Sequence, residues 1–520
     1  FKDSRHSLKK SNEPYRELEE VHGSELNFDA DNSSRCGRNL MNGIDRSMEL
    51  SSAVVIPDDT FTVIQAINAL GFGKFQVKLS LFTGLCWMVD SMEITILSIL
   101  SPSLHCDWGI TRYQQALTTT VVFLGMMLSS TFWTNLSDRY GRKQSLTLCA
   151  VLLFYYACLS SLAPNFLWIL LLRGLVGFAI GCVPQSVTLY AEFLPAKQRG
   201  KCVILLDCFW ALGACFEVAI ALAVMPSFGW RWLLILSTIP LFIFVTITPW
   251  LPESTIFDMT TGRMDRAVST LERVARENKK PLPPGRLVMD RFYRVNHGKL
   301  RDLLSKDMRK TSALLWLVWM STAFCYYGVV LMTTELFHTS SEQCGSWAND
   351  KKEDTCRLDC RLERSDYIDL LWTTLAEFPG IFSTVYAIEK IGRRKTMAFQ
   401  LVMFAILICF LGTACLLSRV TLTIAIFLAR GLIAGVFQAA YVYTPEVYPT
   451  HLRSTGVSAC SAMARIGAMI TPYVAQVFLQ RSVTGAMAVY AGTALCAALA
   501  TLALPVESKN PPTDSSRETR

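Results

Sequence analysis

The chain has 520 residues, of which 51% are hydrophobic and only 18% are charged, and its formal net charge is +8. This composition excludes an ordinary soluble domain, because the apolar residues gather in runs of about 20, the length that crosses a bilayer. We predict an all-α membrane protein with twelve transmembrane helices, which centre on Leu85, Val121, Leu152, Val176, Cys208, Ile239, Leu317, Leu375, Ala405, Leu432, Ala468 and Ala494.

The segment before the first span is polar. Residues 1–57 are rich in Ser, Asn, Glu, Asp, Lys and Arg, so we expect a disordered tail that buries too little apolar surface to fold. No signal peptide is expected, since no apolar core follows a basic start. Residues 58–76 differ and predict an interfacial amphipathic helix, because apolar residues repeat on one helical face at Phe61, Ile64, Ile67 and Leu70.

Basic residues are concentrated in the loops that follow even-numbered spans. They are Arg139, Arg142 and Lys143 after the second span, Lys197, Arg199 and Lys201 after the fourth, and Lys390, Arg393, Arg394 and Lys395 after the eighth. The positive-inside rule predicts that these loops, and with twelve spans both termini, are cytoplasmic. The positive net charge then reflects membrane orientation, and no nucleic-acid partner is expected.

The spans divide into two blocks of six, residues 77–251 and 311–505, joined by a cytoplasmic linker over 252–310. A cytoplasmic tail follows over 506–520, and a long loop over 338–366 is predicted on the lumenal side. Four cysteines are expected on that side, where disulfides form: Cys106, Cys344, Cys356 and Cys360. Two bridges with three pairings are open.

The two blocks carry the same short motifs in the same order. SDRYGRK at 137–143 matches EKIGRRK at 389–395. RGL beginning at Arg173 matches RGL beginning at Arg430, and EFLPAKQR beginning at Glu192 matches EVYPTHLR beginning at Glu446. The matched positions lie 251, 257 and 254 residues apart. We infer two homologous halves of six spans each.

Parallel halves of six spans are the plan of the major facilitator superfamily. SDRYGRK resembles that family's D-x-x-G-R-K loop, and Arg173 with Gly177 and Gly181 resembles its R-x-x-x-G-x-x-x-G helix. EFLPAKQR and PES at 252–254 resemble signals of its sugar and organic-ion branch. The resemblance covers about residues 58–508 and implies a major facilitator fold that works by alternating access.

Further stretches refine this resemblance. D-x-M-E at 90–93 and QAAYVYTPEVYPT at 438–450 are similar to synaptic-vesicle members of the branch, which implies a synaptic or secretory vesicle membrane. Two positions depart from the family pattern: Thr134 stands where a glycine is usual, and Ile256 stands where an arginine is frequent. Both departures bear on how tightly the cytoplasmic side closes.

The duplicated motifs predict two ionic clusters at the cytoplasmic ends of the spans. They consist of Asp138, Arg142, Glu192 and Arg199 in the first half and Glu389, Arg393, Glu446 and Arg453 in the second. We interpret them as a gate whose ion pairs break when this side opens. The alternative is a set of surface pairs that only fix topology, but positive-inside loops need no acidic residues.

Charged residues also occur inside the spans, where each costs about 2.5 kcal/mol or more. They are Asp90, Glu93, Asp207, Glu217, Glu335 and Glu377, with Arg465 midway along the eleventh span. The resemblance implies that spans one, four, five, seven, eight, ten and eleven line a central cavity. Asp90 and Glu93 share one helical face, so one of them is expected to hold a proton that a cationic substrate displaces. A structural pair, for example with Arg465, is the alternative.

Other residues inside the spans have both a functional and a structural interpretation. Trp210, Tyr326 and Tyr327 are candidates to surround an organic cation by cation–π contact, and core packing is the alternative for each. Arg173 and Arg430 are buried bases that serve either structural pairing or proton coupling. Tyr326–Tyr327 also resembles a feature of sugar transporters, but side chains suited to sugar hydroxyls are few.

The sequence therefore predicts a proton-coupled secondary transporter of a small organic ion, with a cation favoured. The rival hypothesis is a non-transporting vesicle-membrane regulator or binding protein on the same fold. Neither an enzyme nor a cofactor is expected, because no zinc-ligand spacing, phosphate-binding loop or nucleophile elbow occurs. The expected partners are the lipid bilayer, protons and the solute, and the resemblance alone suggests an adenine nucleotide.

Overall fold

The computed structural model describes residues 60–289, 300–342, 362–413, 418–449 and 452–505. Contacts separate residues 1–57 from a second unit over 58–520, and all described residues belong to the second unit. The expected disordered tail over 1–57, the tail over 506–520 and most of the expected lumenal loop lie outside the described residues.

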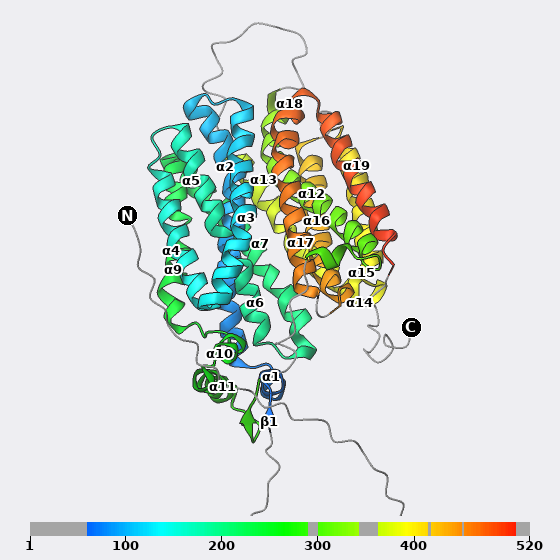
Figure 1. Cartoon of the computed structure of the whole chain (residues 1–520). Coiled ribbons are helices and arrows are strands. Elements are labelled where there is room, and N and C mark those ends of the chain that lie inside the picture. The colour runs from blue at the N-terminus through cyan, green and yellow to red at the C-terminus, as the bar shows by residue number, and fades with distance from the viewer. Residues whose placement is uncertain (1–59, 290–299, 343–361, 414–417, 450–451, 506–520) are drawn as a thin grey trace, which may run out of the picture. The chain divides into compact units, whose positions relative to one another are not determined.

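The first half consists of long apolar helices in consecutive order (Figure 1). They are α2 (Lys74–Trp108), α3 (Arg112–Tyr140), α4 (Arg142–Ser161), α5 (Phe166–Ile180) continued by α6 (Pro184–Glu192), α7 (Ala196–Phe228), and α8 (Trp230–Leu236) continued by α9 (Ile239–Ile247) and the short η1 (Thr248–Trp250). Pro184 and Pro240 open α6 and α9 as first-turn prolines, so both spans continue across a break in the helical hydrogen bonding.

The second half repeats this order (Figure 1). Its elements are α12 (Arg309–Glu342), α13 (Arg364–Leu375), α14 (Glu377–Ile391), α15 (Arg393–Leu411), α16 (Arg419–Val447), α17 (Arg453–Pro472), the π-helix η6 (Tyr473–Phe478), α18 (Leu479–Arg481) and α19 (Val483–Leu502). Eleven helices in the described residues are long and apolar enough to span a bilayer. The eighth span is divided at Ala376 into α13 and α14, which explains the difference from the predicted twelve.

The expected interfacial helix over 58–76 is shorter than predicted. Only α1 (Val63–Leu70) forms, because Gly71 ends it at φ +61°, a conformation that favours glycine, and α2 begins at Lys74. Val63, Ala66 and Ile67 pack on Leu271 of the linker helix α11 (Met264–Asn278). The apolar face of α1 is thus covered by protein.

The linker between the halves is structured where it is described. It contains α10 (Thr255–Thr260), α11, the short strand β2 (Arg286–Leu287) and η3 (Leu300–Leu304). β2 pairs in parallel with β1 (Thr60–Phe61), and Thr60 lies opposite Arg286. The chain segments on either side of the first half are therefore joined to each other.

Small residues let the helices within each half approach closely. A Cβ atom added at Gly177 of α5 would lie 2.1 Å from the backbone oxygen of Val122 in α3. In the second half, a Cβ at Gly380 of α14 would lie 2.4 Å from the oxygen of Gly431 in α16. Contacts between the halves run from α3 to α17 and from α7 to α13, and the central cavity lies among these helices.

Candidate functional site

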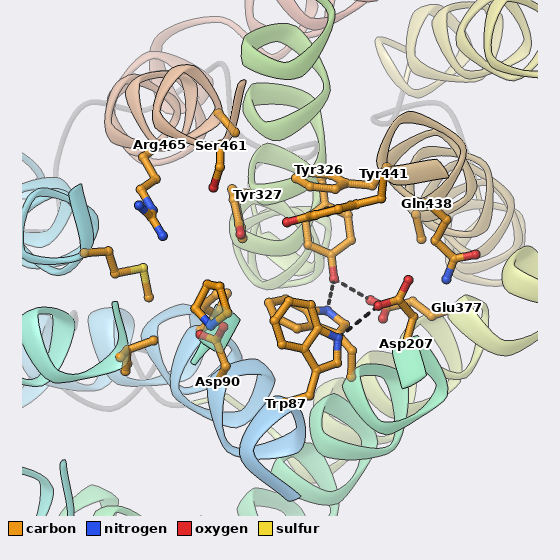
Figure 2. Close-up of a pocket in the computed structure, with 18 of the residues that line it drawn as sticks. Trp87, Asp90, Asp207, Tyr326, Tyr327, Glu377, Gln438, Tyr441, Ser461 and Arg465 are labelled. Carbon is orange, nitrogen blue, oxygen red and sulfur yellow. Dashed lines mark hydrogen bonds between the residues drawn. The ribbon is translucent and has the colours of Figure 1, made fainter. Parts of the chain in front are cut away.

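A cavity of about 110 Å³ lies between the two halves. Figure 2 shows that side chains converge on it from both halves: Trp87, Asp90, Asp207, Tyr326, Tyr327, Glu377, Gln438, Tyr441, Ser461 and Arg465. Phe123 and Met126 add the second span to the set of spans implied by the resemblance. Four of the intramembrane charges singled out in the sequence therefore meet in one place: Asp90, Asp207, Glu377 and Arg465.

One wall of the cavity is a chain of hydrogen bonds between the halves. The indole of Trp210 donates to the Tyr326 hydroxyl at 2.6 Å, and that hydroxyl donates to Glu377 at 3.0 Å. Arg430 donates to the same Glu377 oxygen at 3.0 Å, and both side chains are buried. Because Tyr326 and Arg430 both donate hydrogen bonds to its carboxylate, Glu377 is held in a fixed position at the cavity wall.

Asp207 has a simpler environment. It accepts a hydrogen bond from the indole of Trp87 at 3.0 Å, and it forms no ion pair among the described residues. Trp87 and Trp210 lie with ring centroids 5.4 Å apart, next to this carboxylate. An acid flanked by two indole rings is a suitable environment for an organic cation, since rings and carboxylate both attract positive charge.

Asp90 and Arg465 line the cavity, and neither forms an ion pair among the described residues. Asp90 Oδ1 is buried and has no hydrogen-bond partner in the part of the chain that the structure describes. Arg465 forms no ion pair with Asp90 or with any other described residue, although both side chains face the cavity. The two side chains attract each other electrostatically without forming an ion pair, so the charge of Arg465 becomes available to a ligand when Asp90 binds a proton.

Aromatic side chains enclose much of the remaining space. Tyr327 contacts Phe123 of the other half, with ring centroids 4.8 Å apart, and Tyr326 lies 5.2 Å from Tyr327. Phe437 and Tyr441 stack at 5.7 Å on α16. Phe123, Phe437 and Tyr441 were not predicted from the sequence, because aromatic residues are common in membrane helices and only their position shows a role.

Two predicted site acids lie outside the cavity. Glu93 pairs with Arg173 at 2.7 Å, and both side chains are buried within the first half. Glu217 accepts a hydrogen bond from Ser237 at 2.9 Å and is also fully buried. Glu93 therefore faces Arg173 while Asp90 faces the cavity, although the two acids lie one helical turn apart.

The end of the bundle predicted to be lumenal is closed by polar contacts between the halves. Arg112, at the start of α3, pairs with Glu335 of α12 at 3.2 Å. Gln480 of α18 donates to the same carboxylate at 3.3 Å, and Gln476 donates to the Ser101 hydroxyl at 3.3 Å. Nearby Cys106 is disulfide-bonded, and its partner lies outside the described residues.

The motif residues of the predicted cytoplasmic end form ion pairs inside each half. Arg142 pairs with Glu192 at 2.8 Å and approaches Asp138 at 3.9 Å, while Arg393 pairs with Glu446 at 3.2 Å. The backbone NH groups of Arg142 and Lys143 donate to Glu253 at 2.8 and 3.1 Å. Each of these contacts joins helix ends within one half, and none of them joins the two halves.

Among the described residues, an ionic contact between the halves at this end comes from a different pair. Lys201 of α7 lies 3.0 Å from Glu389 of α14, and both side chains are largely exposed. Arg199, expected in the first cluster, instead donates to the backbone oxygen of Leu194, and Arg453 begins α17 with an exposed side chain. The described residues contain no group of three or more His, Cys, Asp or Glu side chains placed to hold a metal ion.

Comparisons with known proteins agree with this architecture. The family described as sugar (and other) transporter matches residues 65–342, and the major facilitator superfamily matches residues 371–520. The synaptic vesicle 2-related protein of Pongo abelii is 52% identical, covering 89% of this chain and 85% of its own length. Organic cation/carnitine transporter 7 of Arabidopsis thaliana is 34% identical, with 80% of this chain and 88% of its own covered.

A solved structure has the same fold at low sequence identity. The xylose transporter XylE from E. coli, in a partially occluded inward-open conformation, is similar with a TM-score of 0.67 and 15% identity. The match covers 85% of this chain and 100% of that chain.

Proposed function

Because this chain belongs to the major facilitator superfamily, we propose that it is a proton-coupled secondary transporter of a small organic ion, with a cation favoured. Alternating access between the two halves would expose the cavity to each side in turn. The family expected from the duplicated motifs is confirmed by these matches, whereas the cargo and the coupling are our proposal.

The charge of the cavity carries this proposal. Its lining contains three acids, Asp90, Asp207 and Glu377, and one base, Arg465. Arg430, which does not line the cavity, neutralises Glu377. With all of these groups ionised, the three acids therefore exceed the two arginines by one charge. An uncompensated negative charge in a membrane interior is costly, and one bound cation or proton would remove it.

Asp90 is the proposed proton carrier. It lies inside the first span with a buried oxygen that no described protein group satisfies, an environment that favours the neutral acid. Asp207 is the proposed cation site, since the indoles of Trp87 and Trp210 flank it. The name of the Arabidopsis thaliana relative, an organic cation/carnitine transporter, supports the same class of cargo.

The contacts at the two ends support alternating access. Arg112, Glu335 and Gln480 join the halves at the predicted lumenal end. At the other end the exposed Lys201–Glu389 pair contributes little, because exposed ion pairs are typically worth less than about 1 kcal/mol. The motif pairs would keep the helix ends of each half rigid while the halves rock. The relatives named for synaptic vesicles support a vesicle membrane as the location.

Uptake into proteoliposomes under an imposed pH gradient tests the proposal. Pools of organic cations, carboxylates and sugars are compared for the wild type, Asp90→Asn and Asp207→Asn. Glu217→Gln is the matched control, because Glu217 lies on the same helix as Asp207 but outside the cavity. We expect gradient-dependent uptake of cations that both Asn variants lose and the control retains. Absence of uptake from every pool would favour the non-transporting regulator instead.

A further inference from the structure

The three arginines inside the spans have different surroundings. Arg173 pairs with Glu93 at 2.7 Å, and Arg430 pairs with Glu377 at 3.0 Å. Arg465 of α17 has no acidic partner within ion-pair distance among the described residues, and its side chain faces the cavity (Figure 2). The fold thus neutralises two of its intramembrane guanidinium groups and leaves the third to face the ligand space.

An unpaired guanidinium inside a membrane protein is costly. Arginine stays charged at any physiological pH, so it cannot lose its charge as a buried acid can. Its planar group presents several N–H donors, and the partner that fits them best is a carboxylate or another planar oxyanion. Ionised Asp90 offsets part of this cost by electrostatic attraction, and once Asp90 is protonated, a carboxylate that enters the cavity takes over this role.

The cation site lies away from this arginine. Figure 2 shows Arg465 and Ser461 toward one side of the cavity and Asp207, Glu377 and Gln438 toward the other, with Trp87 between them. Asp90 lies on the same side as Arg465 (Figure 2), so that side attracts negative charge once Asp90 is protonated, and the side of Asp207 attracts positive charge. A ligand that matches both sides carries its two charges at opposite ends.

We propose that Arg465 binds a carboxylate on the substrate, so that the transported ion is a small zwitterion with a cationic group at its other end. This inference rests on the proposed function and narrows its class of cargo. The substrate's cationic group contacts Asp207 and the indoles of Trp87 and Trp210, and its carboxylate accepts hydrogen bonds from Arg465.

The charge balance of the whole cavity agrees with this assignment. Arg430 neutralises Glu377, the two ends of the zwitterion neutralise Asp207 and Arg465, and one proton neutralises Asp90. Once Asp90 is protonated, a simple cation would leave Arg465 unmatched, and a sugar would leave both Asp207 and Arg465 unmatched. The zwitterion and the proton together satisfy every charged side chain of the lining.

Ligand-induced thermal stabilisation of the purified full-length protein in detergent tests this proposal. The probes are trimethylammonium carboxylates with one to four methylene groups between the charges, each compared with its own methyl ester. The ester keeps the cation and removes the anion. For the best spacer, we expect the carboxylate to stabilise the wild type at concentrations about tenfold or more below those of its ester.

Variants separate substrate binding from a structural role of the arginine. In Arg465→Gln we expect acid and ester to become equivalent, and Arg465→Lys should recover part of the preference. The double variant Asp90→Asn, Arg465→Gln has the same net charge in the empty cavity as the wild type, because it loses one acid and one base. If Arg465 serves only to balance Asp90, this double variant regains the preference for the carboxylate; our proposal predicts that it does not.

Three results would overturn the proposal: equal stabilisation by acid and ester in the wild type, a preference that survives in Arg465→Gln, or no stabilisation by any probe. This assay uses no gradient and no membrane. A carboxylate preference without gradient-driven uptake would therefore reject the proposed transport while leaving the ligand assignment intact. Uptake of simple cations without a preference for the carboxylate would support the proposed transport and reject the zwitterion as its substrate.

Discussion

Asp90 and Glu93 lie one turn apart on α2 and have opposite surroundings. The carboxylate of Glu93 is buried against Arg173 at 2.7 Å. Asp90 faces the cavity, and its buried Oδ1 has no partner in the described part of the chain. Rotation of about 100° per residue places position i+3 some 60° from position i, which is enough to move one acid out of the cavity and leave the other in it.

This difference predicts opposite effects of neutralising the two acids. Glu93→Gln leaves the fully buried Arg173 without a counter-charge, so we expect a loss of about 3 kcal/mol or more in unfolding free energy. Asp90→Asn removes a buried charge that forms no ion pair in the described part of the chain, so we expect stability to be unchanged or slightly higher. Thermal unfolding of both variants in detergent measures the difference. Equal melting temperatures would contradict the structural assignment of the Glu93–Arg173 pair.

At the scale of residues, the sequence predicted which charged side chains line the cavity, but it did not predict which of them contact each other. Acids and arginines inside apolar runs are conspicuous, so Asp90, Asp207, Glu377 and Arg465 were all candidates, and all four line the cavity. Which acid meets which arginine depends on the rotation and tilt of packed helices, and composition does not encode these. Phe437 and Tyr441 carried no signal at all, since packing aromatics have the same sequence pattern.

Close helix crossings depend on glycine at particular positions. In α5, Gly177 allows the backbone of α3 to approach until an added Cβ would lie 2.1 Å from the Val122 oxygen. Gly492 of α19 offers a matched comparison, because an added Cβ there meets nothing within 4 Å. The same substitution therefore has different expected costs in two membrane helices.

We predict that Gly177→Ala destabilises the protein by roughly 1–3 kcal/mol, because two packed helices must separate to admit the methyl group. Gly492→Ala should be neutral or slightly stabilising, since alanine has the higher helix propensity. Thermal unfolding of the two variants in detergent, side by side, gives the comparison. Similar melting temperatures for both would show that the crossing of α3 and α5 is less tight than described.

The contact of α3 with α12 and α18 at the predicted lumenal end is a second element-scale feature. Glu335 joins Arg112 of the first half to Gln480 of the second. Breaking it with Glu335→Gln should weaken closure there and increase the population of lumen-open molecules several-fold. The measurement is labelling of Ser461→Cys in the cavity by an impermeant maleimide, quantified by mass spectrometry of the peptide. Labelling from the lumenal side that stays at the parent level would show that this contact does not control closure.

The sequence predicted most elements, and its errors have physical causes. The eighth span is divided at Ala376, because Pro379 has no backbone N–H and its ring clashes with the carbonyl of Leu375, four residues earlier. The helix expected over 58–76 stops at Gly71 because that residue takes a left-handed conformation. Apolar periodicity locates helices well, but it does not say whether lipid or another helix covers their apolar face.

Internal duplication determines the arrangement of the whole molecule. Arg142–Glu192 and Arg393–Glu446 occupy equivalent positions in the two halves, as the offsets of 251 and 254 residues predict. Each pair nevertheless closes within its own half, so the predicted gate between halves remains a proposal whose ionic contact is Lys201–Glu389. Repeats therefore reveal the symmetry of the fold, while contacts across the symmetry axis involve residues outside the repeated motifs.

The most direct test of the central claim is to measure whether protons move with the substrate. Proteoliposomes that contain a pH-sensitive dye receive a trimethylammonium carboxylate from outside, with no initial pH gradient. We predict a change of internal pH with the wild type and with the Glu217→Gln control, and none with Asp90→Asn. Substrate entry without a pH change in the wild type, or an unaltered pH change in Asp90→Asn, would contradict the account.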